Sequence, residues 1–201
     1  RLLRIRGEAM QAAVPVGAGA MAALLGLDFA AAQAVAAEAA QGEVCQAAND
    51  NDPGQVVISG HLAAVERALD IARAHGARRA ILLPVSAPFH SALMEPAAGV
   101  MARALAEVAL QAPVVPLVAN VVAEAVQDPE VIRSLLVDQV TGSVRWRESV
   151  LWMAARGVTE IWEIGAGKAL SGMIRRIAPG ITCRAVGTPE DVAAAVAARQ
   201  G

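Results

Sequence analysis

The first fifteen residues carry apolar side chains at a helical spacing, with charged positions between them. The run RLLRIRGEAMQAAVP therefore predicts an amphipathic helix, and Pro15 sets its end because proline disfavours helical backbone at the residue before it. The chain opens at Arg1 without a methionine, so we expect it to begin inside a domain. From residue 17 onward, short apolar runs alternate with helical stretches.

Six elements are predicted between residues 17 and 85, in the order β-α-β-β-α-β. They are the strand GAMAALLGL, a helix over Phe29–Ala40 with Asp28 as its N-cap, the strand EVCQAAN, the strand QVVISG after an NDNDPG turn, the helix HLAAVERALDIARAHG and the buried strand RRAILLPV. This order is the ferredoxin-like arrangement. We therefore predict a small ferredoxin-like α+β subdomain over residues 17–85.

The rest of the chain predicts strands and helices that alternate, as in α/β proteins with a parallel sheet. The loop SAPFHSALMEP leads into a helix that ends near residue 109. Then follow the strand VVPLVANV of the buried parallel type, helices over residues 129–140 and 143–156, the strand TEIWEIG, the helix KALSGMIRRI, the strand ITCRAVGTP and the helix EDVAAAVAAR. We predict that residues 1–16 and 86–201 form a larger α/β subdomain.

Composition narrows the function classes. The 201 residues are 56% hydrophobic and 18% charged with a formal net charge of −2, so neither nucleic acid nor an anionic membrane is an expected partner. The uncharged run from Ala9 to Leu27 is broken by glycines and Pro15, which argues against a membrane span. Two distant cysteines, Cys45 and Cys183, predict neither a disulfide framework nor a metal site, and a cytoplasmic location is expected.

Two glycine-rich runs do not fit nucleotide-binding motifs. GAGAMA at residues 17–22 follows a helix where a dinucleotide fingerprint needs a strand. GAGK at residues 165–168 has Trp162 at the first glycine position of a P-loop, and Ala169 replaces its Ser or Thr. His61 and His75 stand at the two ends of one predicted helix, where capping or surface roles are the simplest interpretation.

His90 and Arg6 are the stronger candidates. His90 follows a strand in a loop, where α/β proteins place catalytic groups, although a buried structural histidine is an alternative. Arg6 precedes Gly7, which leaves room beside it, and its alternative role is a surface salt bridge. A histidine base needs a nucleophile within reach, and no G-x-S-x-G serine motif occurs in these residues.

Six separated motifs occur over nearly the whole chain. In order, they are IRGEAMQAAVPVGAGAMAALLGL, NDNDPGQVVISG, VSAPFHSALMEPAA, NVVAEAV, DQVTGSVRWRESV and EIGAGKALSGMIRRI. Together they resemble the malonyl-CoA:acyl carrier protein transacylase family. The resemblance implies a hydrolase-like acyltransferase core with a ferredoxin-like insertion. It also implies that the chain corresponds to the C-terminal two-thirds of such an enzyme, without the G-x-S-x-G serine, and is inactive alone.

The resemblance assigns roles to six residues. It makes His90 the base that activates the serine, with the backbone carbonyl of Gln139 holding the imidazole, and it makes Arg6 the group that binds the malonyl carboxylate. Phe89 matches the pattern of malonyl-selective enzymes. Asn49 and Asn51 match asparagines at the pocket rim.

The implied reaction transfers malonyl from CoA to the phosphopantetheine thiol of acyl carrier protein through a serine ester, in fatty-acid synthesis. No metal or other cofactor is expected, the partners are malonyl-CoA and acyl carrier protein, and a monomer is expected. Three alternatives stay open: a non-catalytic binding module built on the ferredoxin-like part, an acyltransferase of polyketide synthesis, and a thioester hydrolase on the same core.

Overall fold

The computed structural model describes residues 1–200, which form two compact units. The first contains Arg1–Trp146 and the second begins at Arg147. The subdomain boundaries predicted near residues 16 and 85 both lie inside the first unit.

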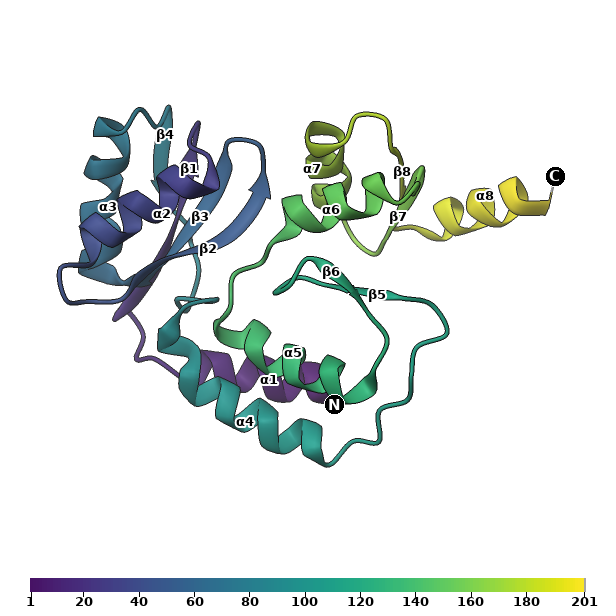
Figure 1. Cartoon of the computed structure of the whole chain (residues 1–201), viewed down its shortest axis with the longest axis horizontal. Helices are drawn as coiled ribbons and strands as arrows, with labels where there is room; N and C mark the ends of the chain where they lie inside the picture. Colours follow the sequence, from purple (N-terminus) through teal and green to yellow (C-terminus); the bar gives the residue numbers. More distant parts are fainter. Residues whose placement is uncertain (201) are drawn as a thin grey trace. The chain divides into compact units, whose positions relative to one another are not determined.

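A four-stranded antiparallel sheet with two helices forms the first part of the first unit (Figure 1). The elements follow the predicted order β-α-β-β-α-β, and the strand order in the sheet is β2-β3-β1-β4. Their bounds are β1 Gly19–Leu25, α2 Phe29–Ala40, β2 Cys45–Asp52, β3 Gln55–His61, α3 Leu62–Ala74 and β4 Arg79–Leu82. Asp28 caps α2 as predicted, because its carboxylate accepts a hydrogen bond from the backbone N–H of Ala31 at 2.8 Å.

The two faces of this sheet have different partners. Leu24 and Ile58 are fully buried in the core that α2 and α3 cover. Because side chains alternate along a strand, Met21 and Val57 lie on the opposite face, where they pack with Phe89 of the loop that follows β4. This second face therefore lies against the segment that carries His90.

Two predictions for the sheet were wrong in detail. The predicted NDNDPG turn is confined to Pro53 and Gly54, because β2 continues through Asp52 with two bulges against β3 and the N–H of Asp50 bonds to the carbonyl of Val144. The predicted buried strand RRAILLPV contains only the short β4. Since β4 is an edge strand, paired with β1 alone, most of its side chains are exposed.

Three helices form a second layer of the first unit: α1 (Leu2–Ala12), α4 (Glu95–Ala106) and α5 (Pro129–Thr141). α1 and α5 both pack against α4 (Figure 1). A short helix, η1 (Ala92–Met94), leads into α4. The buried side chains that join them include Met10, Met94, Met101, Leu105 and Val140.

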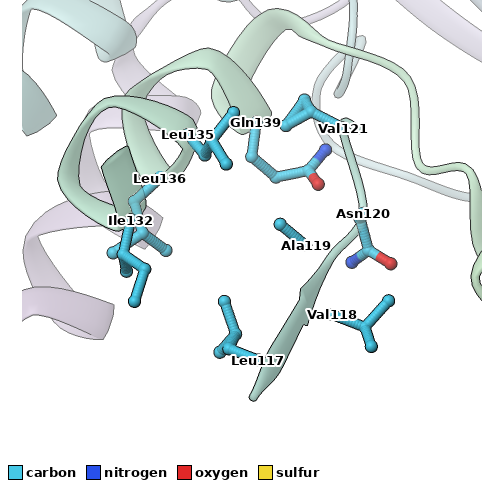
Figure 2. Close-up of a pocket in the computed structure, with 9 residues that line it drawn as sticks. All are labelled: Leu117, Val118, Ala119, Asn120, Val121, Ile132, Leu135, Leu136 and Gln139. Atoms are coloured by element: carbon cyan, nitrogen blue, oxygen red, sulfur yellow. The ribbon is translucent and has the colours of Figure 1, made fainter. Parts of the chain in front are cut away.

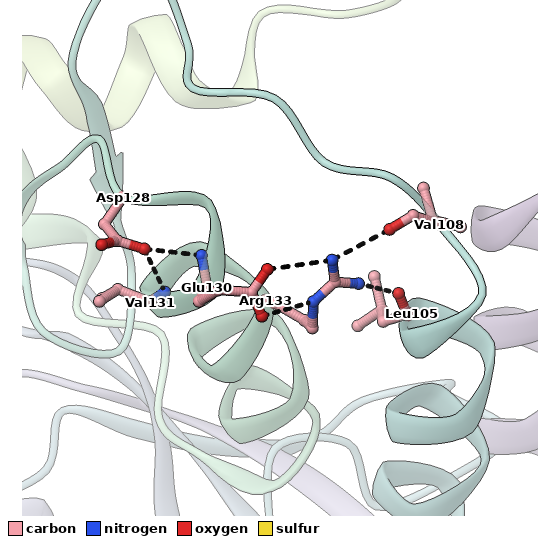
Figure 3. A network of polar contacts seen from close by, with 6 residues as sticks. All are labelled: Leu105, Val108, Asp128, Glu130, Val131 and Arg133. Atoms are coloured by element: carbon pink, nitrogen blue, oxygen red, sulfur yellow. Dashed lines mark hydrogen bonds and ion pairs between the residues drawn. The ribbon is translucent and has the colours of Figure 1, made fainter.

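Arg133 joins α5 to the end of α4 (Figure 3). Its guanidinium donates hydrogen bonds to the carbonyl of Leu105 and, at 3.0 Å, to that of Val108, and it pairs with Glu130 at 3.1 Å. These carbonyls belong to the last turn of α4 and the residues after it, which lack helical N–H partners. Asp128 caps the start of α5 by accepting a hydrogen bond from the N–H of Glu130 at 2.7 Å.

The predicted buried parallel strand VVPLVANV is also wrong. β5 (Leu117–Ala119) pairs antiparallel with β6 (Glu124–Val126), and Leu117 is exposed. The two strands lie close together in the chain, so a short connection can join them only in the antiparallel sense.

The second unit follows the predicted α/β pattern. β7 (Glu160–Ile164) and β8 (Thr182–Val186) pair in parallel, as predicted for this half of the chain. Their companions are α6 (Trp146–Ala155), which starts at the last residue of the first unit, α7 (Ala169–Ile177) and α8 (Pro189–Gln200). Across residues 1–200, no helix has both the length and the apolar character that a membrane crossing requires.

Candidate active site

One pocket in the first unit, with a volume of about 360 Å³, brings together four of the six predicted site residues. Arg6 reaches it from α1, Asn49 from β2, and Phe89 and His90 from the loop after β4. The remaining lining residues are Gly7, Met10, Gln11 and Met21. Residues that are far apart in the sequence thus meet at one hollow.

The imidazole of His90 is held in one orientation. Its Nδ1 lies 2.9 Å from the backbone carbonyl oxygen of Gln139. A carbonyl can only accept a hydrogen bond, so Nδ1 carries the proton and Nε2 keeps its lone pair. The resemblance predicted this contact, and the structure contains it.

The environment keeps His90 neutral. Burial lowers its pKa below the usual value, and the positive charge of Arg6 acts in the same direction, while the carbonyls of Gln139 and Gly142 raise it. Burial is the largest of these effects. A neutral imidazole with a free Nε2 can accept a proton near neutral pH, which a general base must do.

The chain that follows α5 fixes Gln139 in place. The side-chain amide of Gln139 donates to the carbonyl of Gly142 at 3.0 Å. Val144 then pairs with β2, because its N–H bonds to the carbonyl of Ala48 and its carbonyl accepts from the N–H of Asp50. Gly142 has no room for a side chain, since a Cβ there would lie 2.8 Å from the carbonyl oxygen of Asp138. The end of α5 is therefore tied to the strand that carries Asn49.

Arg6 is a half-buried cation that has no partner in the part of the chain that the structure describes. Within residues 1–200 its guanidinium makes no hydrogen bond and no ion pair, and burial lowers its pKa. Arg4 on the same helix differs, because its side chain is 84% exposed and pairs with Glu8 at 2.9 Å. The unused donors of Arg6 face a pocket, and a guanidinium binds a carboxylate through two parallel hydrogen bonds. This corner of the pocket suits an anionic ligand.

Asn51 does not line the pocket, although Asn49 does. Both belong to β2, where residues two apart normally share a face. The pairing of β2 with β3 shifts between Asp50 and Asp52, so Asn51 is the extra residue of a bulge. A bulge disrupts the regular alternation of side chains between the two faces of a strand. Only one asparagine of the NDNDPG run therefore lines the pocket.

Three further lining residues were not among the predicted site residues, although simple periodicity could have suggested them. Met10 lies four positions after Arg6 and Gln11 four positions after Gly7, which places each pair on one face of α1. Met21 follows from the alternation in β1, on the face away from α2 and α3. With Phe89, the two methionines give the pocket an apolar wall beside Arg6 and His90.

A second, smaller pocket of about 160 Å³ lies between β5 and α5, and Gln139 contributes its side chain to it (Figure 2). Its lining is apolar apart from the amides of Asn120 and Gln139. It contains no group that titrates near neutral pH, so it offers no acid or base. The pocket that contains His90 is the candidate active site.

The GAGK loop, His61 and His75 have structural roles outside the pocket. The N–H groups of Leu170 and Ser171, at the start of α7, donate to the carboxylate of Glu163 at 3.0 and 2.8 Å. An acid bound at this helix terminus repels phosphate, so the GAGK loop is not a phosphate site. Nδ1 of His61 accepts from the N–H of Val44, and His75 pairs with Glu38. Among residues 1–200, no three His, Cys, Asp or Glu side chains gather as metal ligands.

The sequence of the chain matches a known protein family and several characterised relatives. Residues 1–191 match the model of the acyl transferase domain family. The malonyl CoA-acyl carrier protein transacylase of Escherichia coli K12 is 48% identical over 196 residues, which cover 98% of this chain and 63% of the relative. The chain thus spans a little under two thirds of that relative's length.

The fold of the chain is also similar to solved structures of malonyltransferases. An acyl-carrier-protein-S-malonyltransferase from Bartonella henselae is 55% identical with a TM-score of 0.95, and the match covers all of this chain and 64% of that one. A type II PKS acyl carrier protein has been solved in complex with its malonyl-transacylase. That structure is 42% identical with a TM-score of 0.95, over 98% of this chain and 64% of its own.

Proposed function

The chain belongs to the acyl transferase domain family, and on that premise we propose that its parent protein transfers a malonyl group from CoA to the phosphopantetheine thiol of an acyl carrier protein. The names of the E. coli and B. henselae relatives describe this reaction. The observation that carries the proposal is one pocket with both a neutral, oriented imidazole and an unpaired guanidinium. The His90 imidazole suits acyl transfer, and the Arg6 guanidinium selects an acyl group that has a carboxylate.

The nucleophile in this proposal is a serine outside the 201 residues, as the resemblance implies, since they contain no G-x-S-x-G motif. Nε2 of His90 takes the hydroxyl proton while the serine oxygen attacks the malonyl thioester carbonyl. The CoA thiolate then leaves with the proton from the imidazolium, and a malonyl-serine ester remains. In the second half-step the carrier thiol gives its proton to Nε2 and attacks the ester, and the serine leaves with that proton.

The other pocket residues shape the substrate site in this proposal. Arg6 binds the malonyl carboxylate, and the ring of Phe89 beside the base disfavours a branched acyl group. The side chain of Asn49 can hydrogen-bond the acyl chain, and Asn51 stays a proposal for the pocket rim. The reaction uses acid-base and nucleophilic steps alone, so we propose no metal or cofactor besides malonyl-CoA and the carrier protein.

The predicted organisation also enters here as a proposal. Residues 17–85 form a ferredoxin-like subdomain inserted into a hydrolase-like subdomain of residues 1–16 and 86–201. The strand order β2-β3-β1-β4 supports the first part, and the parallel pair β7–β8 supports the second. We further propose that the protein is a monomer and that it is cytoplasmic. The free thiols of Cys45 and Cys183 support the cytoplasmic location, because disulfides are rare in that compartment.

The test compares Arg6→Ala with Arg4→Ala in the full-length enzyme. Arg6→Ala should reduce malonyl transfer to the carrier protein by roughly 10- to 100-fold, the loss expected for a charge-assisted hydrogen bond, and spare acetyl transfer. Arg4→Ala is the matched control, because Arg4 is exposed on the same helix and outside the pocket. An equal loss for malonyl and acetyl substrates would remove Arg6 from the carboxylate site.

Polyketide synthesis is a second candidate pathway, because one similar structure is a type II PKS carrier protein with its malonyl-transacylase. The chemistry at His90 and Arg6 is the same in both pathways. Transfer rates to a fatty-acid carrier and to a polyketide carrier, measured with one enzyme preparation, separate them. If the enzyme transfers malonyl from malonyl-CoA to neither carrier protein and does not exchange it with free CoA, the chain is better explained as a non-catalytic binding module.

A further inference from the structure

His90 has an unusual backbone conformation. Its φ is +56°, in the left-handed region that non-glycine residues rarely adopt. Such a conformation is unfavourable and persists only where the surroundings hold it. Contacts that hold the loop on both sides of His90 therefore affect where the imidazole lies.

Two hydrogen bonds hold the loop around His90 and directly after it. The buried hydroxyl of Ser91 donates to the carbonyl of Pro88 at 2.8 Å. The N–H of Ala92 donates to the side-chain oxygen of Gln46 on β2 at 2.7 Å. Both bonds fix the chain at or after position 88, and neither reaches α1.

The side before His90 is joined to α1 by Gln11. Its side-chain nitrogen donates to the hydroxyl oxygen of Ser86 at 2.6 Å. Ser86 lies four residues before His90 in the same loop, and Gln11 lies five residues after Arg6 on α1 and lines the same pocket. This hydrogen bond connects the helix that carries the cation to the loop that carries the base, in addition to the packing of Ala87 and Phe89 in the core that includes Met10.

We propose that Gln11 is a positioning residue for His90 and acts through Ser86. The proposal rests on the function proposed above. The Gln11–Ser86 bond keeps the loop close to α1, so that the imidazole and the Arg6 guanidinium stay on opposite parts of one substrate site. Gln11 has no titratable group and its amide nitrogen already bonds to Ser86, so it transfers no proton itself.

The kinetic test uses Gln11→Ala, Ser86→Ala and the double variant of the full-length enzyme. An exposed hydrogen bond of this kind supports a population shift of roughly two- to tenfold, so kcat should fall by that factor while KM for malonyl-CoA stays constant. The double variant should fall no further, because either change removes the same bond. Ser86→Thr keeps the hydroxyl and should restore kcat.

Gln33→Ala is the matched control, because Gln33 is an exposed helical glutamine on α2 that makes no side-chain hydrogen bond within the described residues. It should leave kcat unchanged. A loss in Gln11→Ala with normal activity in Ser86→Ala would mean that Gln11 contacts substrate directly, and would overturn the proposal. A rise in KM at constant kcat, or additive losses in the double variant, would overturn it as well.

A second measurement does not depend on malonyl transfer. The protein segment has only three histidines, so NMR can follow the ring of His90 beside those of His61 and His75. When the loop loosens, His90 gains contact with water and moves away from Arg6, so its pKa should rise towards the ordinary value in Gln11→Ala and Ser86→Ala. Unchanged His90 titration would refute positioning even in an active enzyme, whereas an enzyme without malonyl transfer but with this shift would refute only the proposed function.

Discussion

Replacing Arg133 with methionine should loosen the helix that carries Gln139. Methionine keeps an unbranched apolar stem, so the change mainly removes the guanidinium that bonds to the carbonyls of Leu105 and Val108 (Figure 3). The Arg133 side chain is only 21% exposed, and water reaches these carbonyls poorly while the stem covers them.

The size of the effect follows from these contacts. Hydrogen bonds that involve a charged group contribute about 1.5–3 kcal/mol each, and the exposed partner Glu130 adds about 0–1 kcal/mol. The carbonyls recover part of this by binding water after the change, so we expect the opening free energy of α5 to fall by about 2–4 kcal/mol. His90 loses its carbonyl partner whenever α5 opens, so the effect extends to the site.

Amide hydrogen exchange on the 201-residue chain measures this directly. Protection should fall in α4 and α5 and stay unchanged in α2 and α3, which belong to a separate core. Arg73→Met is the matched control, because Arg73 also pairs with an acid three positions away, Asp70, and is 55% exposed, and its side chain bonds to no carbonyl among the described residues. Equal losses for the two variants would refute the reasoning, since the carbonyl contacts would then contribute nothing.

Two further predictions concern the pocket. In the full-length enzyme, His90→Ala should slow formation of the malonyl-enzyme by roughly 10²–10⁴, the usual loss for a general base, and an unchanged single-turnover rate would exclude that role. In an NMR titration, His90 should deprotonate below its usual pKa, and Arg6→Gln should raise this midpoint because a nearby positive charge is lost. A midpoint that does not move would show that burial alone lowers the His90 pKa.

The sequence could predict those features that depend on nearby residues. Asp28 caps α2 through a bond to a residue three positions away, and the strand and helix periods within residues 17–85 gave the right element order. Met10 could also have been predicted as a lining residue, because its position relative to Arg6 follows from the helical repeat. In each case one local period or one local hydrogen bond determines the outcome.

Features that depend on distant pairing could not be predicted from the residues. Val144, more than ninety positions away, forms backbone hydrogen bonds with Ala48 and Asp50 of β2, and nothing in the local sequence indicates this pairing. Gln139 acts on His90 through its backbone carbonyl, which every residue type has, so its side chain gives no signal. That contact was predicted only by resemblance to a family.

The electrostatics of the pocket give a reason for the selectivity expected of Arg6→Ala. Arg6 lowers the pKa of His90, so in the proposed function it would weaken the base while it binds a carboxylate. For an acetyl group, loss of Arg6 removes no binding contact and leaves a more basic imidazole, so transfer is spared or increased. For a malonyl group, the charge-assisted bonds lost exceed any gain in basicity, and transfer falls. In the proposed function, the cation that lowers the pKa of His90 is thus also the group that discriminates between the two acyl groups.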